Sequence, residues 1–169
     1  MGYDSGGGTW TTAASSNNVA IGHYTMDAAM NGALYNTALG NLSLGALTEG
    51  DNNVAIGYQS GDALTTGGDN TFLGTETGTG TTAVSRAVLI GYAAGRDDMT
   101  SDANGSVGIG SYALEDITSG IGNTAVGGYA LKEEDDGDYS TAIGYQALNA
   151  QTGVDGTVGN TAVGYQAGL

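Results

Sequence analysis

The stretch Asn53–Gly61, NVAIGYQSG, decides the fold, because the chain repeats it with small changes along nearly its whole length. Related stretches are NVAIGHYTM at residues 18–26, STAIGYQAL at residues 140–148 and NTAVGYQAG at residues 160–168. The glycine at the fifth place marks nine copies, 17 to 20 residues apart: Gly22, Gly40, Gly57, Gly74, Gly91, Gly110, Gly127, Gly144 and Gly164. A repeat of this short period is typical of a solenoid in which each copy forms one coil.

The three residues before each glycine predict a short strand with two different faces. The first is Val or Thr in every copy and the third is Ile, Leu or Val, whereas the middle one is mostly Ala. Such residues favour a strand, and alternation puts the first and third on one face. The Ala side is expected inside a narrow coil, where Phe72 and Leu89 fit poorly. The other face then packs against other chains, which we favour, or lines a wider solenoid.

The residues after each glycine predict a second short extended segment, of the form YQAL or YQAG, with the glycine as a sharp corner between the two. The linkers that follow are rich in Gly, Asp, Ser and Thr, which predicts loops. The fold expected is all-β, a parallel β-solenoid of nine coils over residues 18–169. Residues 1–17 are a Gly/Ser/Thr-rich N-terminal cap or linker, in which Trp10 covers the first coil.

Composition excludes several classes of function. The 169 residues include 18 acids, three bases, one His and no Cys, with a net charge of −15. A phosphate backbone would be repelled, so nucleic acid is not an expected partner. No stretch is apolar and long enough to insert in a membrane. Only Glu76 among the acids lies inside a nine-residue copy, so we expect the linkers to carry the charge into solvent.

The units NVAIG, STAIGYQAL and NTAVGYQAG resemble the head repeats of trimeric autotransporter adhesins of the YadA type. They resemble still more closely the NTAVGYQAL arrays of phage tail fibre proteins. The resemblance covers residues 18–168 and implies a left-handed β-roll with three chains around one axis. It also implies a role as the head or shaft of a surface-binding fibre, at the virion surface or outside the cell. The signal peptide, coiled-coil stalk, membrane anchor and cleaved chaperone domain of such proteins are absent from this sequence.

Acidic residues supply the candidate chemical sites. The densest cluster of oxygen ligands could hold Ca²⁺, although its spacing matches no known calcium loop and a solvated loop is the favoured interpretation: Glu133, Glu134, Asp135, Asp136 and Asp138. The pairs Asp97–Asp98 and Glu115–Asp116 suggest glycoside hydrolysis. That reaction needs two carboxyl groups held across a cleft, which adjacent loop residues do not offer. We therefore expect no enzymatic activity, no cofactor and no metal site.

Two further columns are best explained by structure. His23 continues an exposed aromatic row in the place that Tyr58, Tyr92, Tyr145 and Tyr165 hold in other copies. The ten tyrosines and Trp10 either cover neighbouring coils, the favoured interpretation, or stack on sugars or on a partner protein. Asn opens six copies and Ser opens two others, which predicts a polar ladder from side chain to backbone: Asn18, Asn36, Asn53, Asn70, Asn123, Asn160, Ser106 and Ser140.

Three functions are compatible with the repeat. The first is a homotrimeric, non-enzymatic fibre module that presents loops to a glycan or protein on a host surface. Its epitopes are the irregular linkers Arg96–Gly105 and Asn149–Gly159, because insertions in a solenoid emerge on one face. The second is an extracellular filament of subunits joined end to end, favoured by a final copy with no cap. The third, an ice- or surface-binding solenoid, lacks an uninterrupted Thr row.

Overall fold

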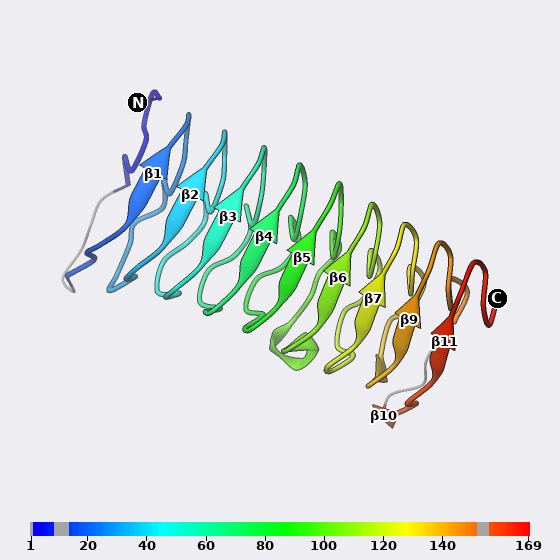
Figure 1. The fold of residues 1–169 in the computed structure, drawn as a ribbon. Helices are drawn as coiled ribbons and strands as arrows, with labels where there is room; N and C mark the ends of the chain where they lie inside the picture. Colours follow the sequence, from blue (N-terminus) through cyan, green and yellow to red (C-terminus); the bar gives the residue numbers. More distant parts are fainter. Residues whose placement is uncertain (1, 9–13, 152–155) are drawn as a thin grey trace.

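The computed structural model describes residues 2–8, 14–151 and 156–169, which form a rod-shaped parallel β-solenoid with its two ends far apart (Figure 1). Nine three-residue strands form one sheet in the order β1-β2-β3-β4-β5-β6-β7-β9-β11. They are β1 Val19–Ile21, β2 Thr37–Leu39, β3 Val54–Ile56, β4 Thr71–Leu73, β5 Val88–Ile90, β6 Val107–Ile109, β7 Thr124–Val126, β9 Thr141–Ile143 and β11 Thr161–Val163. These nine strands and the solenoid are those that the sequence predicts. We number the coils by their glycines, from coil 1 (Gly22) to coil 9 (Gly164).

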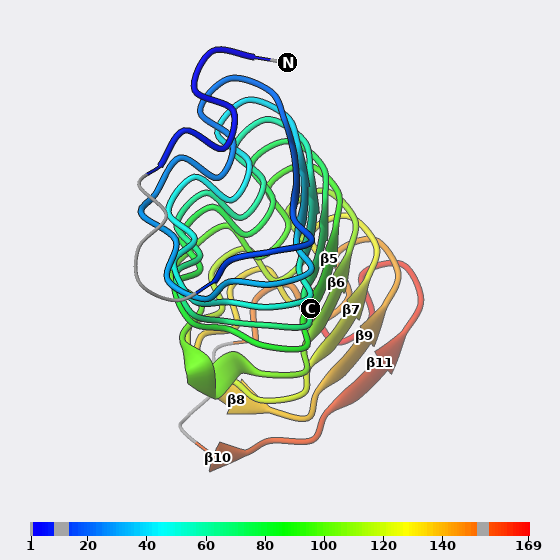
Figure 2. The ribbon, with the colours of Figure 1, turned by 90° about the vertical axis from the view of Figure 1, so that its left-hand side faces the viewer.

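The remaining regular elements lie in the linkers of the later coils. A 3₁₀ turn, η1 Ser101–Ala103, lies in the 19-residue interval between Gly91 and Gly110. Two short strands, β8 Gly137–Asp138 and β10 Gly156–Thr157, form a second parallel sheet. The end-on view shows the coils superimposed, with β8 and β10 at a corner away from the main sheet (Figure 2). Within the described ranges, no helix is long and apolar enough to cross a membrane.

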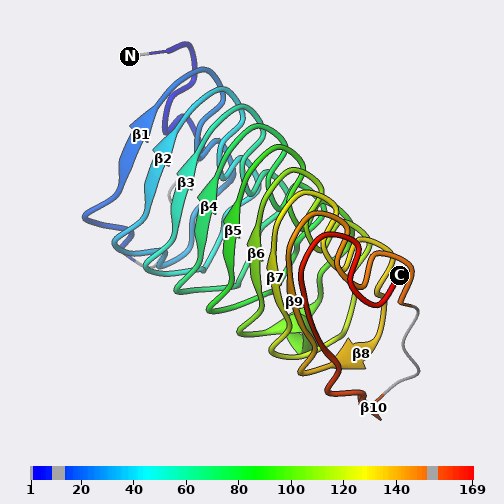
Figure 3. The same ribbon diagram turned by 45° about the vertical axis from the view of Figure 1, so that its right-hand side comes forward.

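Each strand pairs in register with the same motif positions of the next coil, so the coils repeat one backbone path (Figure 3). The motif glycine is required for two reasons, both clear at Gly57. Its φ is 140°, which favours glycine, and a Cβ atom there would lie 2.1 Å from the carbonyl oxygen of Gly74. The glycine corner predicted from sequence is therefore confirmed.

The expectation of a second strand after the glycine is wrong. Residues 58–63 form turns, and the same is true of the matching segments in the other described coils. The cause is left-handed backbone at alternate positions, as at Gln59 (φ 54°) and Gly61 (φ 62°). An extended strand needs negative φ throughout, so two left-handed residues in this short segment curl it around the edge of the coil.

The middle strand residue faces inward, as predicted, and Ala38, Ala55, Ala125 and Ala142 are fully buried. The linkers, however, also contribute to the core, which corrects the expectation that they are solvated loops. Large apolar linker side chains are fully buried, among them Leu47, Leu64, Met99 and Ile117. They lie seven or eight residues after the motif glycine and pack in the same cluster as the strand alanines.

The polar ladder predicted from the first motif position is confirmed. Asn53 Oδ1 accepts hydrogen bonds from Asn70 N at 3.1 Å and Asn70 Nδ2 at 2.9 Å. Asn53 Nδ2 donates to Gly67 O at 2.9 Å and to Asn36 Oδ1 at 3.0 Å. Among the described side chains, no buried nitrogen or oxygen lacks a hydrogen bond. The ladder therefore ties each coil to the next while satisfying groups inside the rod.

Candidate functional surfaces

The outer face of the main sheet is uncharged and largely apolar along the whole rod. Each strand presents its first and third residues outward, so two columns of Val or Thr and of Ile, Leu or Val run from β1 to β11. Ile21 is 48% exposed and Leu73 is 43% exposed, and neither column contains a charged residue. A long continuous apolar surface of this kind is typical of an interaction site.

A row of tyrosine rings runs along coils 5 to 9. The centroids of successive rings are 5.2, 5.1, 5.8 and 5.8 Å apart, in the order Tyr92, Tyr112, Tyr129, Tyr145 and Tyr165. A hydrogen bond with Tyr112 and the charge of Glu76 raise the pKa of Tyr92. The rings contact each other between coils, alternately edge-on and stacked, and this contact agrees with the favoured interpretation of the aromatic row.

The sequence prediction of this row was incomplete. Tyr112 and Tyr129 stand one motif position later than Tyr92, Tyr145 and Tyr165, so the repeat alone did not place these five rings in one row. Ring contact across coils depends on side-chain direction and not on motif position alone. At the other end of the rod, exposed His23 lies beside Tyr24, with ring centroids 6.5 Å apart.

An ion-pair network crosses coils 5 to 7. Glu115, only 3% exposed, pairs with Arg96 Nη2 at 2.5 Å and with Lys132 Nζ at 3.3 Å. Lys132 Nζ also lies 3.3 Å from Asp116 Oδ2. Burial alone would lower the pKa values of Arg96 and Lys132, but the neighbouring carboxylates outweigh it and raise both. The pair Glu115–Asp116 therefore binds bases of its own chain.

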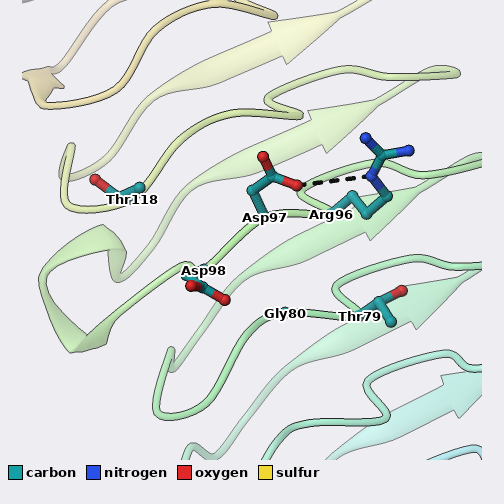
Figure 4. A pocket seen from close by; sticks show the side chains of 6 residues that line it. All are labelled: Thr79, Gly80, Arg96, Asp97, Asp98 and Thr118. Carbon is teal, nitrogen blue, oxygen red and sulfur yellow. Dashed lines mark ion pairs between the residues drawn. The ribbon is translucent and has the colours of Figure 1, made fainter.

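The pair Asp97–Asp98 lies in a shallow depression of about 430 Å³ (Figure 4). The walls come from three successive linkers: Thr79, Gly80, Arg96, Asp97, Asp98 and Thr118. Arg96 Nε lies 3.6 Å from Asp97 Oδ1. One carboxylate of the pair, that of Asp97, thus contacts the guanidinium group of Arg96. Residues 96–98 of the predicted epitope Arg96–Gly105 line the depression.

The acidic run 133–138 is held mainly by hydrogen bonds, and one of its members is not solvated. Glu134 is fully buried, where it accepts hydrogen bonds from Gly137 N at 2.8 Å and from Gln151 Nε2. Asp136 Oδ1 accepts from Ser119 Oγ at 2.7 Å, and Asp138 Oδ1 accepts from Ile121 N at 2.8 Å. The expectation of a solvated loop is therefore wrong for Glu134, which stands in a column that is otherwise rich in Leu, Ile and Met.

Metal binding by the run finds no support in its geometry. Across residues 2–8, 14–151 and 156–169, no three His, Cys, Asp or Glu side chains are grouped to hold a metal ion. Two predicted features lie wholly or partly outside the described residues: Trp10, and residues 152–155 of the epitope Asn149–Gly159.

The fold and these surfaces define the class of the protein, a parallel β-solenoid with an apolar sheet face and polar linkers. No family model, curated protein or solved structure matches the chain.

Proposed function

We propose that this chain is a non-enzymatic fibre module, a homotrimer in which three rods pack through their outer sheet faces. Its linkers contact a receptor, either a glycan or a protein, on a host surface, and its location is the virion surface or the outside of a cell. One observation carries the proposal: the sheet exposes two uncharged, largely apolar columns along all nine strands. Burial against other copies would remove this surface from water. The number three and the host surface come from the resemblance to adhesin and tail fibre repeats.

The distribution of charge supports packing through this face. The nine strands of the main sheet contain no acid or base, whereas 17 of the 18 acids lie outside the nine-residue copies. Chains packed through their strands therefore keep most carboxylates at the periphery, where water and salt screen their repulsion. Packing through the linkers would instead bring acids of neighbouring chains together. The sheet face is thus the surface on which a chain of net charge −15 associates most easily.

The test is the molar mass in solution, measured by light scattering. The expected mass is three times 16.7 kDa. The variant Leu73→Lys places a charge in the middle of the sheet face and is expected to yield monomers. Thr66→Lys, at an exposed linker position, is the matched control and should remain trimeric. A wild-type chain that is monomeric at all concentrations would contradict the proposal.

The alternative is a filament in which rods join end to end. It is favoured by the regular stacking of the coils, because in-register parallel pairing, as between β9 and β11, is a pattern that strands of another subunit can continue. In this case the mass would grow continuously with concentration, and Leu73→Lys would not prevent growth. A discrete trimer would exclude this alternative as the main form.

A further inference from the structure

A second depression, which we call the slot, lies across the turns and linkers of coils 1 to 3. Its volume is about 390 Å³, and its apolar lining comes from Tyr24, Leu42, Ala46 and Ala63. Two carboxylates, Asp27 and Asp62, also line it. The slot exists because the linker of coil 2 has Gly45 between these two acids. A Cβ atom on Gly45 would lie 2.6 Å from Asp62 Oδ1, so the carboxylate occupies space that a side chain would take.

The fifth residue after each motif glycine forms a column along the rod, which we call the strip. In the later coils acids of this strip are paired with bases, whereas the slot contains acids without bases. Asp27, Asp62, Arg96, Glu115 and Lys132 all stand five residues after a motif glycine. In coils 5 to 7 this column forms the Arg96–Glu115–Lys132 network. Among the described residues, no ion pair includes Asp27 or Asp62. The later coils thus show how this strip binds a basic side chain, and the first three coils offer the acids alone.

The walls of the slot suit the rest of such a side chain. Lysine and arginine carry their charge on an apolar stem, which packs on surfaces like those of Ala46, Ala63 and Leu42. The ring of Tyr24 offers a favourable contact to a cation. Burial raises the pKa of Asp62 against the opposing effect of a hydrogen bond from Gln59, so this carboxylate is partly withdrawn from water. A cation at this point would stabilise its charged form.

We propose that the slot docks lysine or arginine side chains of a basic partner polypeptide. The net charge of −15 draws such partners toward the rod and repels anionic ones. A second copy of this chain is a poor occupant, because Arg96 and Lys132 are already paired and Arg86 is the one other base in the sequence. This inference rests on the proposed function in one respect: it narrows the proposed receptor to a basic polypeptide. It does not depend on the trimer, because all residues of the slot belong to one chain.

The test is the binding of a capped, fluorescently labelled tetralysine peptide to the full chain, followed by anisotropy at an ionic strength of about 0.15 M. The double variant Asp27→Asn/Asp62→Asn removes both slot charges at constant size. The double variant Asp69→Asn/Asp135→Asn is the matched control, since it changes the net charge equally at two exposed acids outside the slot. The same peptide with acetylated lysines controls for binding that does not need the ammonium groups.

We expect the slot variant to bind the peptide at least about tenfold more weakly, and the control variant to bind within about twofold of wild type. Ala46→Leu, which fills the slot without changing charge, should weaken binding like the slot variant. Equal losses in the two Asn variants, or equal binding of the acetylated peptide, would overturn the inference. Binding at the slot by a monomeric wild-type chain would support it while contradicting the proposed trimer, so the two failures are distinguishable.

Discussion

Phe72 fills the space that Gly61 leaves empty in the neighbouring coil. A Cβ atom on Gly61 would lie 2.8 Å from Cδ2 of Phe72, and Phe72 is fully buried. The preceding pair of coils reverses the arrangement: the large Leu44 stands four places after its glycine, and the small Ala55 is the strand residue of the next coil. The poor fit expected for Phe72 and Leu89 is thus relieved by Gly61, Gly78 and Gly95. The rod keeps a constant width because large and small residues exchange places.

This exchange predicts coupling between positions 61 and 72. Phe72→Ala is expected to lower the free energy of unfolding by about 3–5 kcal/mol, because it leaves a cavity. Gly61→Leu should also destabilise, since its side chain collides with the Phe72 ring. The double variant reproduces the arrangement of Leu44 and Ala55, so its loss should be smaller than the sum of the single losses. Urea unfolding of the four proteins measures this, and additive losses would contradict the packing described.

A substitution at the glycine corner should be among the most damaging. Gly57→Ala places a Cβ atom 2.1 Å from the carbonyl oxygen of Gly74 at a φ of 140°. The expected loss in unfolding free energy exceeds about 3 kcal/mol, because the coils must separate or the backbone must change. Gly128→Ala is the control, since its nearest neighbour would be a Tyr145 ring atom at 3.4 Å. Thermal unfolding of both variants should show a large shift for the first and a small one for the second.

The polar ladder should be sensitive to truncation. Asn53→Ala removes the acceptor of Asn70 N and the donor to Gly67 O, both of which are inside the rod. Each buried group left unpaired costs about 1–3 kcal/mol, and we expect a total loss near the upper end. Asn53→Ser should lose less, because Ser106 and Ser140 occupy the same position in other coils. Equal losses for Ala and Ser, measured by denaturant unfolding, would contradict a role in hydrogen bonding.

Asp62 predicts a pH-dependent effect on stability. Burial raises its pKa in the folded chain, so its protonated form favours folding and that contribution is lost as pH rises through the folded pKa. At neutral pH the ionised carboxyl therefore destabilises the fold. Asp62→Asn should raise Tm at neutral pH. The gain in the free energy of unfolding should be no more than about 0.5 kcal/mol, because the carboxyl group is half-exposed. The gain should disappear in acid, and a gain that persists there would contradict this cause.

The sequence predicted the parts of the fold that repeat in every coil. Strand positions, the corner at Gly57 and the inward Ala55 follow from residue types that recur at fixed places. The turns at Gln59 could not be foreseen, because a non-glycine residue at positive φ leaves no mark in composition. Buried Leu47 and Leu64 did leave a signal, as aliphatic residues seven places after the glycine, but the linkers were treated as loops.

The slot was beyond the reach of pattern analysis for another reason. It depends on the absence of a side chain at Gly45, and on Asp62 of the next coil leaning into that space. Neither residue departs from the composition of an ordinary linker. Contacts between different motif positions of adjacent coils can be found only from the three-dimensional structure. The residues that recur at one motif position can be found from the sequence.

The in-register pairing of Ala38 with Ala55, and of Ala55 with Phe72, has a consequence for how such a gene changes length. The junction between any two successive coils therefore has the same backbone position and the same strand pairing. Recombination between nearly identical repeats would therefore delete or duplicate a whole coil without creating a new kind of junction. Each such event would alter the reach of the rod by roughly 4.8 Å, the spacing of neighbouring strands.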